Sequence, residues 1–194
     1  ATQSPVILAG HSRGGLVVSQ AAETAPEAVD ALVYICAMML PDGMSRAEFK
    51  GMEAANPAFD ALITPIANGH GTRITGEYPQ DVFAQLSPPE AVAAAMARLA
   101  DEPHGPRATP LRLTAERWGS LPRTYVECTE DRTIPIASQR LMQELSPGAT
   151  VVNAAGKTVI PGLVDAHCHL NQPEEVMRKL LPIALNWGVT TVRM

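Results

Sequence analysis

Leu8-Ala9-Gly10-His11-Ser12-Arg13-Gly14-Gly15 is the stretch that decides the fold, because it places a serine between glycines where an apolar run gives way to a helical pattern. Residues 5–9 have the continuous apolar, β-branched character of a strand buried on both faces, and residues 16–23 read as a helix. The chain must turn in very few residues between them, which predicts a strained, exposed Ser12 at a helix N-terminus. We expect Gly10 and Gly14 to be required, because a Cβ on either would collide with the neighbouring strand or helix.

The same alternation of strand and helix continues along the chain. Residues 31–37 and 123–128 are further apolar strands, and residues 135–145 form a helix that opens with a proline. This order predicts an α/β protein with a parallel sheet. Residues 41–121 are instead rich in proline, glycine and methionine, with short amphipathic runs such as 89–99. We expect this stretch to form a helical cap over the ends of the strands.

Composition narrows the possible partners and the compartment. The net charge is −5 and the pI is about 5.5, which excludes the basic surface typical of proteins that bind nucleic acid or anionic membranes. We expect no membrane partner, because no apolar run approaches the length of a membrane span and none has the flanks of a signal peptide. Cys36, Cys128 and Cys168 each lie in apolar or strand-like runs, which favours buried free thiols in a reducing, cytoplasmic compartment.

Three motifs together resemble the α/β-hydrolases, in particular the small esterases that include methylesterase-like and hydroxynitrile-lyase-like enzymes. They are residues 10–15 around Ser12, residues 37–43 and residues 125–135. The resemblance covers residues 1 to about 149 and implies a partial three-layer α/β sandwich whose N-terminal strands are missing. It also implies ester hydrolysis through an acyl-enzyme with no cofactor, with Ser12 as nucleophile, Arg13 N–H as oxyanion donor and Asp131 as the triad acid.

The position of Asp131 in the chain has two readings. It follows a predicted strand and precedes a predicted helix, so it should lie on the same sheet edge as Ser12, where ligands bind in open α/β sheets. A carboxylate at that edge would orient a histidine and stabilise its protonated form. The alternative is a surface aspartate that only caps the next helix.

The general base is the least defined part of the triad. Because the triad order in this fold is serine, aspartate, histidine, only His167 and His169 remain downstream. Residues 172–176 resemble the start of the family's final helix, and counting back from them favours His167. Counting forward from a strand at 149–152 reaches Lys157 instead. We therefore expect His167 as the base, with His169 and the absence of any base as open alternatives.

Residues 156–170 and 188–193 resemble a second family, the metal-dependent amidohydrolases, at the start of their barrel. His167 and His169 are two apart on a strand-like run, so both would face one side and suit one zinc or similar divalent ion. This predicts a chimera, with a hydrolase core at 1–149 and an amidohydrolase-like segment at 150–194.

Three functions follow from these patterns. The first is a serine esterase acting on small hydrophobic esters. The second is a metal-dependent amidohydrolase fragment that uses His167 and His169. The third is an inactive, ligand-binding hydrolase-like domain. The sequence favours the esterase and does not indicate an oligomeric state.

Overall fold

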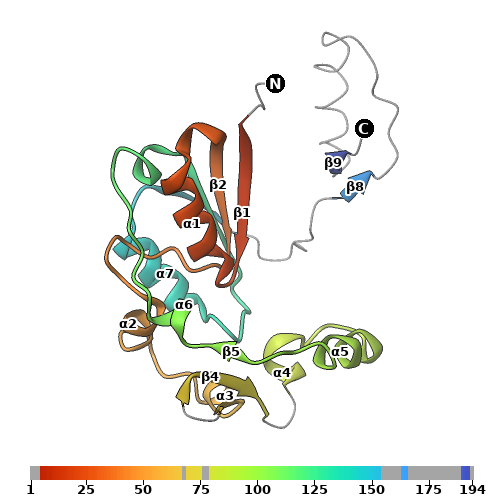
Figure 1. The fold of residues 1–194 in the computed structure, drawn as a ribbon. Helices are drawn as coiled ribbons and strands as arrows, with labels where there is room; N and C mark the ends of the chain where they lie inside the picture. The colour runs from red at the N-terminus through yellow and green to blue at the C-terminus, as the bar shows by residue number, and fades with distance from the viewer. Residues whose placement is uncertain (1–4, 67–68, 76–78, 154–162, 166–188, 193–194) are drawn as a thin grey trace. The chain divides into compact units, whose positions relative to one another are not determined.

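The computed structural model describes residues 5–66, 69–75, 79–153, 163–165 and 189–192. The chain divides into two compact units, Ala1–Ala155 and Gly156–Met194. The first unit is built on a four-stranded sheet in the order β1-β2-β6-β7, with every neighbouring pair parallel (Figure 1). The strands are β1 (Val6–His11), β2 (Val29–Ile35), β6 (Arg123–Glu127) and β7 (Ala149–Asn153). The predicted parallel sheet is therefore confirmed.

Helices make the crossovers from β1 to β2 and from β6 to β7 that a parallel sheet requires. Helix α1 (Gly14–Thr24) and the short 3-10 helix η1 (Pro26–Ala28) connect β1 to β2, and α7 (Ile136–Leu145) connects β6 to β7. The core lies against this sheet. Tyr34 of β2 and Tyr125 of β6 are register partners with stacked rings 6.4 Å apart, and both are fully buried.

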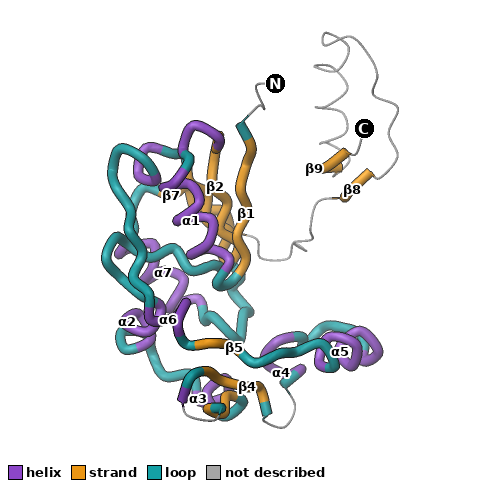
Figure 2. Tube along the Cα trace, in the orientation of Figure 1, coloured by secondary structure: helices purple, strands orange, loops and turns teal. Residues whose placement is uncertain are grey.

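A long insertion joins β2 to β6. Its helices are α2 (Arg46–Lys50), α3 (Pro57–Asp60), α4 (Gln80–Phe83), α5 (Pro89–Met96), α6 (Gly105–Ala108) and the 3-10 helix η3 (Trp118–Ser120). It also contains an antiparallel sheet of β3 (Ile63–Pro65), β4 (Gly71–Ile74) and β5 (Glu102–Pro103). Figure 2 shows β4 and β5 among the helices and loops of the insertion. These short helices lie within or next to residues 41–121, the stretch expected to form a helical cap. The small sheet was not predicted, because strands of two to four residues are too short to show an alternating pattern.

The insertion contacts the carboxyl ends of the parallel strands. Asn56 Nδ2 donates to the carbonyl oxygen of Arg132, 2.9 Å away, in the loop that follows β6. Arg13, which follows Ser12 in the turn after β1, forms an ion pair with Glu102 of β5 through two hydrogen bonds. In Figure 1 the insertion accordingly lies at the end of the sheet toward which the strand arrows point.

The second unit contributes one described element pair. Strands β8 (Leu163–Asp165) and β9 (Val189–Val192) run parallel to each other. His167, His169, Cys168 and Lys157 lie outside the described residues. Within the part of the chain that the structure describes, no helix has the length and apolar character to cross a membrane.

Candidate active site

Ser12 lies in the tight turn between β1 and α1. Its φ is +52°, a left-handed conformation that residues other than glycine rarely adopt. Two bonds to its carbonyl oxygen hold the turn, one from Met38 N at 2.8 Å and one from Gly15 N at 3.3 Å. The predicted strained strand-to-helix turn is confirmed.

The glycines around Ser12 differ from the expectation at one position. A Cβ on Gly10 would lie 2.8 Å from the carbonyl carbon and oxygen of Gly14, so the requirement for Gly10 is confirmed. A Cβ on Gly14 meets nothing within 4 Å, so the prediction for Gly14 was wrong. The collision expected at Gly14 is found at Gly15 instead, because a Cβ on Gly15 would come very close to the backbone of Met38. Gly15 is buried against the segment that follows β2, whereas the Cβ direction of Gly14 is open.

A chain of buried hydroxyl groups fixes α1 behind the turn. Trp118 Nε1 donates to Tyr34 Oη at 2.9 Å, and Tyr34 Oη lies 2.7 Å from Ser19 Oγ. Ser19 Oγ in turn donates to the carbonyl oxygen of Gly15 at 2.8 Å. Burial raises the pKa of Tyr34, so its hydroxyl remains a donor at neutral pH. The hydroxyl groups of Tyr34 and Ser19 are therefore both hydrogen-bonded, as buried polar groups require.

Arg13 occupies the N-cap position of α1. The first N–H groups of a helix have no acceptor within the helix, and the helix dipole places positive potential there, so this terminus suits an oxyanion. The guanidinium of Arg13 binds both carboxylate oxygens of Glu102. Sequence reasoning missed this ion pair because the two residues are 89 positions apart and carry no local signal.

Asp131 lies in the loop between β6 and α7, half-buried. Its Oδ1 accepts hydrogen bonds from Thr133 N at 2.7 Å and Ile134 N at 2.8 Å. These bonds form a local turn within the loop and hold the carboxylate in one orientation, whereas α7 begins later, with Pro135 at its N-cap and no side-chain cap, so Asp131 does not cap the helix as the alternative expected. Because β1 and β6 are parallel and only β2 separates them, Ser12 and Asp131 lie on the same edge of the sheet.

Cys36 follows β2, the strand between those two loops. It is 4% exposed and has a φ of +35°. Burial and the negative charge of Asp131 raise the pKa of the Cys36 thiol. The sequence predicted a buried free thiol at this position and gave no sign of its proximity to the carboxylate of Asp131.

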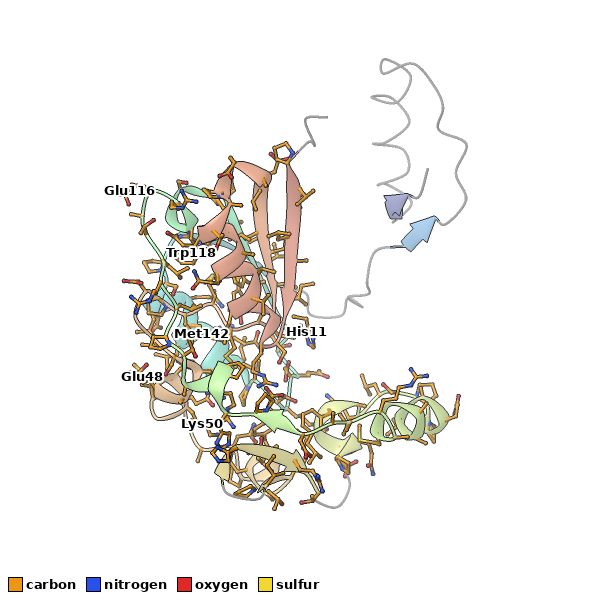
Figure 3. All side chains as sticks on the ribbon, viewed as in Figure 1. His11, Glu48, Lys50, Glu116, Trp118 and Met142 are labelled. Atoms are coloured by element: carbon orange, nitrogen blue, oxygen red, sulfur yellow. The ribbon has the colours of Figure 1, made fainter. Side chains whose placement is uncertain are left out.

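The base candidates, His167 and His169, lie outside the described residues. Strand β7 runs parallel to β6, so the chain leaves Asn153 at the edge that carries Ser12 and Asp131. His11 is exposed at the end of β1 (Figure 3). Among the described residues, no group of three or more His, Cys, Asp or Glu side chains is placed to hold a metal ion.

Comparison with known proteins gives a consistent result. Residues 2–179 match the model of the alpha/beta hydrolase family. Putative methylesterase 14, chloroplastic, of Arabidopsis thaliana is 31% identical over 192 residues, covering 94% of this chain and 53% of the relative. The pyrethroid hydrolase of Sphingobium wenxiniae is 32% identical over 152 residues, covering 75% of this chain and 54% of the relative. A crystal structure of a pyrethroid hydrolase from Sphingobium faniae superposes with a TM-score of 0.71 at 26% identity, covering 94% of this chain and 72% of that one.

Two limits follow from these alignments. The chain spans about half the length of the first two curated relatives. The family match continues past the expected join near residue 150 to residue 179, so the amidohydrolase-like segment and the chimera are not supported. A short apolar strand followed by two histidines is too brief a pattern to separate the two folds.

Proposed function

The chain belongs to the alpha/beta hydrolase family, and from that premise we propose that it is a serine esterase that cleaves carboxylic esters through an acyl-enzyme on Ser12. The observation that carries this proposal is the left-handed backbone of Ser12 at the turn between β1 and α1. Such a conformation costs on the order of 1–3 kcal/mol and persists where surrounding structure over-determines it, most often at functional sites.

In the proposed reaction, Ser12 Oγ attacks the carbonyl carbon of the ester while a histidine accepts its proton. The N–H of Arg13 donates to the oxyanion of the tetrahedral intermediate. The C–O bond to the alcohol then breaks, and the histidine returns the proton to the departing oxygen. Water repeats these steps on the acyl-enzyme and releases the acid. The reaction needs no cofactor.

Asp131 is the proposed orienting acid. Backbone N–H groups of Thr133 and Ile134 bind its Oδ1 and fix the carboxylate, and its second oxygen is the proposed acceptor for an imidazole N–H. Two strand spacings, about 10 Å, separate the backbones of β1 and β6. An imidazole with a hydrogen bond at each end spans roughly 8 Å, which suits a histidine between two side chains that extend from those strand ends.

His167 is the proposed base, because the triad order of the family leaves only His167 and His169 after Asp131. The proposed substrates are small hydrophobic esters. The names of the relatives, methylesterase and pyrethroid hydrolase, support an ester substrate class. The aromatic pair Phe59 and Phe83, with ring centroids 5.9 Å apart, gives the insertion an apolar element.

Labelling with a fluorophosphonate tests the nucleophile directly. We expect a single adduct on the Ser12 peptide by mass spectrometry, its loss in Ser12→Ala, and normal labelling in Ser120→Ala, an exposed serine of the insertion. The absence of an adduct on Ser12 would favour the inactive, ligand-binding alternative.

Hydrolysis of p-nitrophenyl acetate tests the other two roles. Removing a general base or its orienting acid typically costs 10²–10⁴ in rate, so Asp131→Asn and His167→Ala should each lose at least about a hundredfold in kcat. His169→Ala is the matched control and should keep the wild-type rate. If His169→Ala is the inactive variant, the base assignment moves to that residue. If Asp131→Asn keeps full activity, the triad is wrong.

A further inference from the structure

Arg46 has an unusual environment for a charged residue. It is the first residue of α2, where a capping box between Ser45 and Glu48 begins the helix. Arg46 is 8% exposed. Its Nη2 donates to Glu53 Oε1 at 2.8 Å, but its Nη1 is buried with no acceptor among the described residues. A buried, charged donor without an acceptor is costly, so this atom points to a ligand that supplies one.

Arg107 is the second cation at this place. It lies in α6, which packs against α2, and it is half-buried. Its guanidinium has no ion-pair or hydrogen-bond partner within the described part of the chain. Burial and the charge of Arg46 lower the pKa of Arg107, so two like charges are held near each other by helix packing. Such an arrangement attracts an anion.

The carboxylates nearby are already engaged. Glu102 forms an ion pair with Arg13. Glu53 Oε1 accepts from Arg46 and also lies 3.7 Å from Lys50 Nζ. Neither carboxylate pairs with Arg107, whose charge therefore has no partner among the described residues. Arg13 belongs to the same cluster. Burial lowers the pKa of Arg13, and the nearby charges of Arg107 and Arg46 lower it further.

The cluster lies at the same edge of the sheet as the proposed nucleophile. Arg13 directly follows Ser12, and Arg46 belongs to the segment that leaves β2 at the same edge of the sheet. We propose that Arg46 and Arg107 bind a carboxylate carried by the acyl part of the ester, so that the preferred substrate is a half-ester of a dicarboxylic acid. Guanidinium groups suit this role because their paired N–H donors match the two oxygens of a carboxylate. This inference rests on the proposed esterase function and names its substrate class.

A pair of substrates of equal chain length tests the inference. p-Nitrophenyl hemisuccinate carries a carboxylate where p-nitrophenyl butyrate ends in a methyl group. We expect the wild-type chain to prefer the hemisuccinate in kcat/KM, and Arg107→Met to lower the ratio of the two kcat/KM values at least tenfold. Arg98→Met, which removes an exposed arginine after α5, is the matched control and should keep the wild-type ratio.

Calorimetric titration with succinate tests the site without turnover. We expect succinate to bind the wild-type chain and to bind Arg107→Met at least tenfold more weakly. Uncharged succinamide should bind the wild-type chain more weakly than succinate does. Because Arg107 has no protein acceptor among the described residues, its replacement should leave the thermal unfolding midpoint near the wild-type value, and Arg46→Lys provides a second, charge-conserving variant.

Two results would overturn the inference: no binding of succinate to the wild-type chain, or an unaltered substrate ratio in Arg107→Met. Failure of the esterase proposal is distinguishable from both. It would appear as a Ser12 that does not react with fluorophosphonate, while the succinate titration would still report on the arginine site.

Discussion

Replacing Gly15 with alanine should destabilise the protein strongly, whereas the same change at Gly14 should be neutral or stabilising. The two glycines are adjacent in the sequence, and both lie in the first turn of α1. A Cβ on Gly15 would lie 2.9 Å from both the carbonyl carbon and the nitrogen of Met38. A Cβ on Gly14 would meet nothing within 4 Å, and the backbone there is helical.

The expected magnitudes follow from these contacts. Forcing a methyl group into a packed interior costs typically 1–3 kcal/mol, and more where the neighbour cannot move. Met38 is such a neighbour, because its N–H is bonded to the carbonyl oxygen of Ser12 at 2.8 Å. We therefore expect Gly15→Ala to lose about 3 kcal/mol or more. At Gly14, alanine gains up to about 1 kcal/mol from helix propensity and from the smaller entropy of the unfolded chain.

Urea unfolding of the full chain, followed by circular dichroism at 222 nm, measures both effects. The free energy of unfolding should differ between the two variants by about 3–4 kcal/mol, a difference larger than the uncertainty of the extrapolation. Gly10→Ala should resemble Gly15→Ala, because its Cβ would lie 2.8 Å from the backbone of Gly14. Equal losses in Gly14→Ala and Gly15→Ala would refute the steric argument.

Three further predictions concern the interior. Cys36 should react with iodoacetamide at pH 8 at least tenfold more slowly than an exposed thiol, because burial and the charge of Asp131 raise the pKa of Cys36. Peptide mapping should show faster labelling of Cys36 in Asp131→Asn than in the wild-type protein. The hydrogen bond from Arg140 holds the pKa of Glu127 below its ordinary value of 4.5, so the stability that this carboxylate contributes is present above pH 4.5 and lost as the pH falls below it. Urea unfolding at pH 7 and pH 3.5 should therefore show a smaller loss in Glu127→Gln than in the wild type, and an equal loss would contradict the assignment. Tyr34→Phe removes a hydroxyl with two buried partners and should cost about 1–3 kcal/mol, measurable as a lower thermal midpoint, and no change in that midpoint would mean that water replaces the hydroxyl.

The parallel sheet and its crossover helices could be predicted from the sequence because each element is long enough to show its own period. The predicted strand at 31–37 corresponds to β2, Val29–Ile35, and the predicted helix at 135–145 corresponds to α7, Ile136–Leu145. Ser12 could be located for a related reason: its glycine spacing is a local constraint that a single turn imposes.

Features that depend on contacts distant in sequence could not be predicted. The pairing of Arg13 with Glu102 joins the turn to β5, and neither residue has a neighbour that signals the other. The error at Gly14 has the same origin. Spacing identifies a glycine-rich turn, but which glycine faces the backbone of Met38 depends on how the segment after β2 passes α1.

The conformation of Ser12 requires that its surroundings compensate for backbone strain, and three independent contacts do so. Met38 holds the carbonyl oxygen of Ser12, the hydroxyl chain from Trp118 through Tyr34 and Ser19 holds the first turn of α1, and Glu102 holds the side chain of Arg13. A buried hydrogen bond contributes about 1 kcal/mol net, so two or three such contacts are enough to offset a strain of about 1–3 kcal/mol. Two of the three involve the insertion, through Trp118 of η3 and Glu102 of β5. The insertion therefore helps to hold the turn that presents Ser12, in addition to lying over the edge of the sheet, and a change in the insertion at Glu102 can reach the proposed nucleophile through the backbone of Arg13.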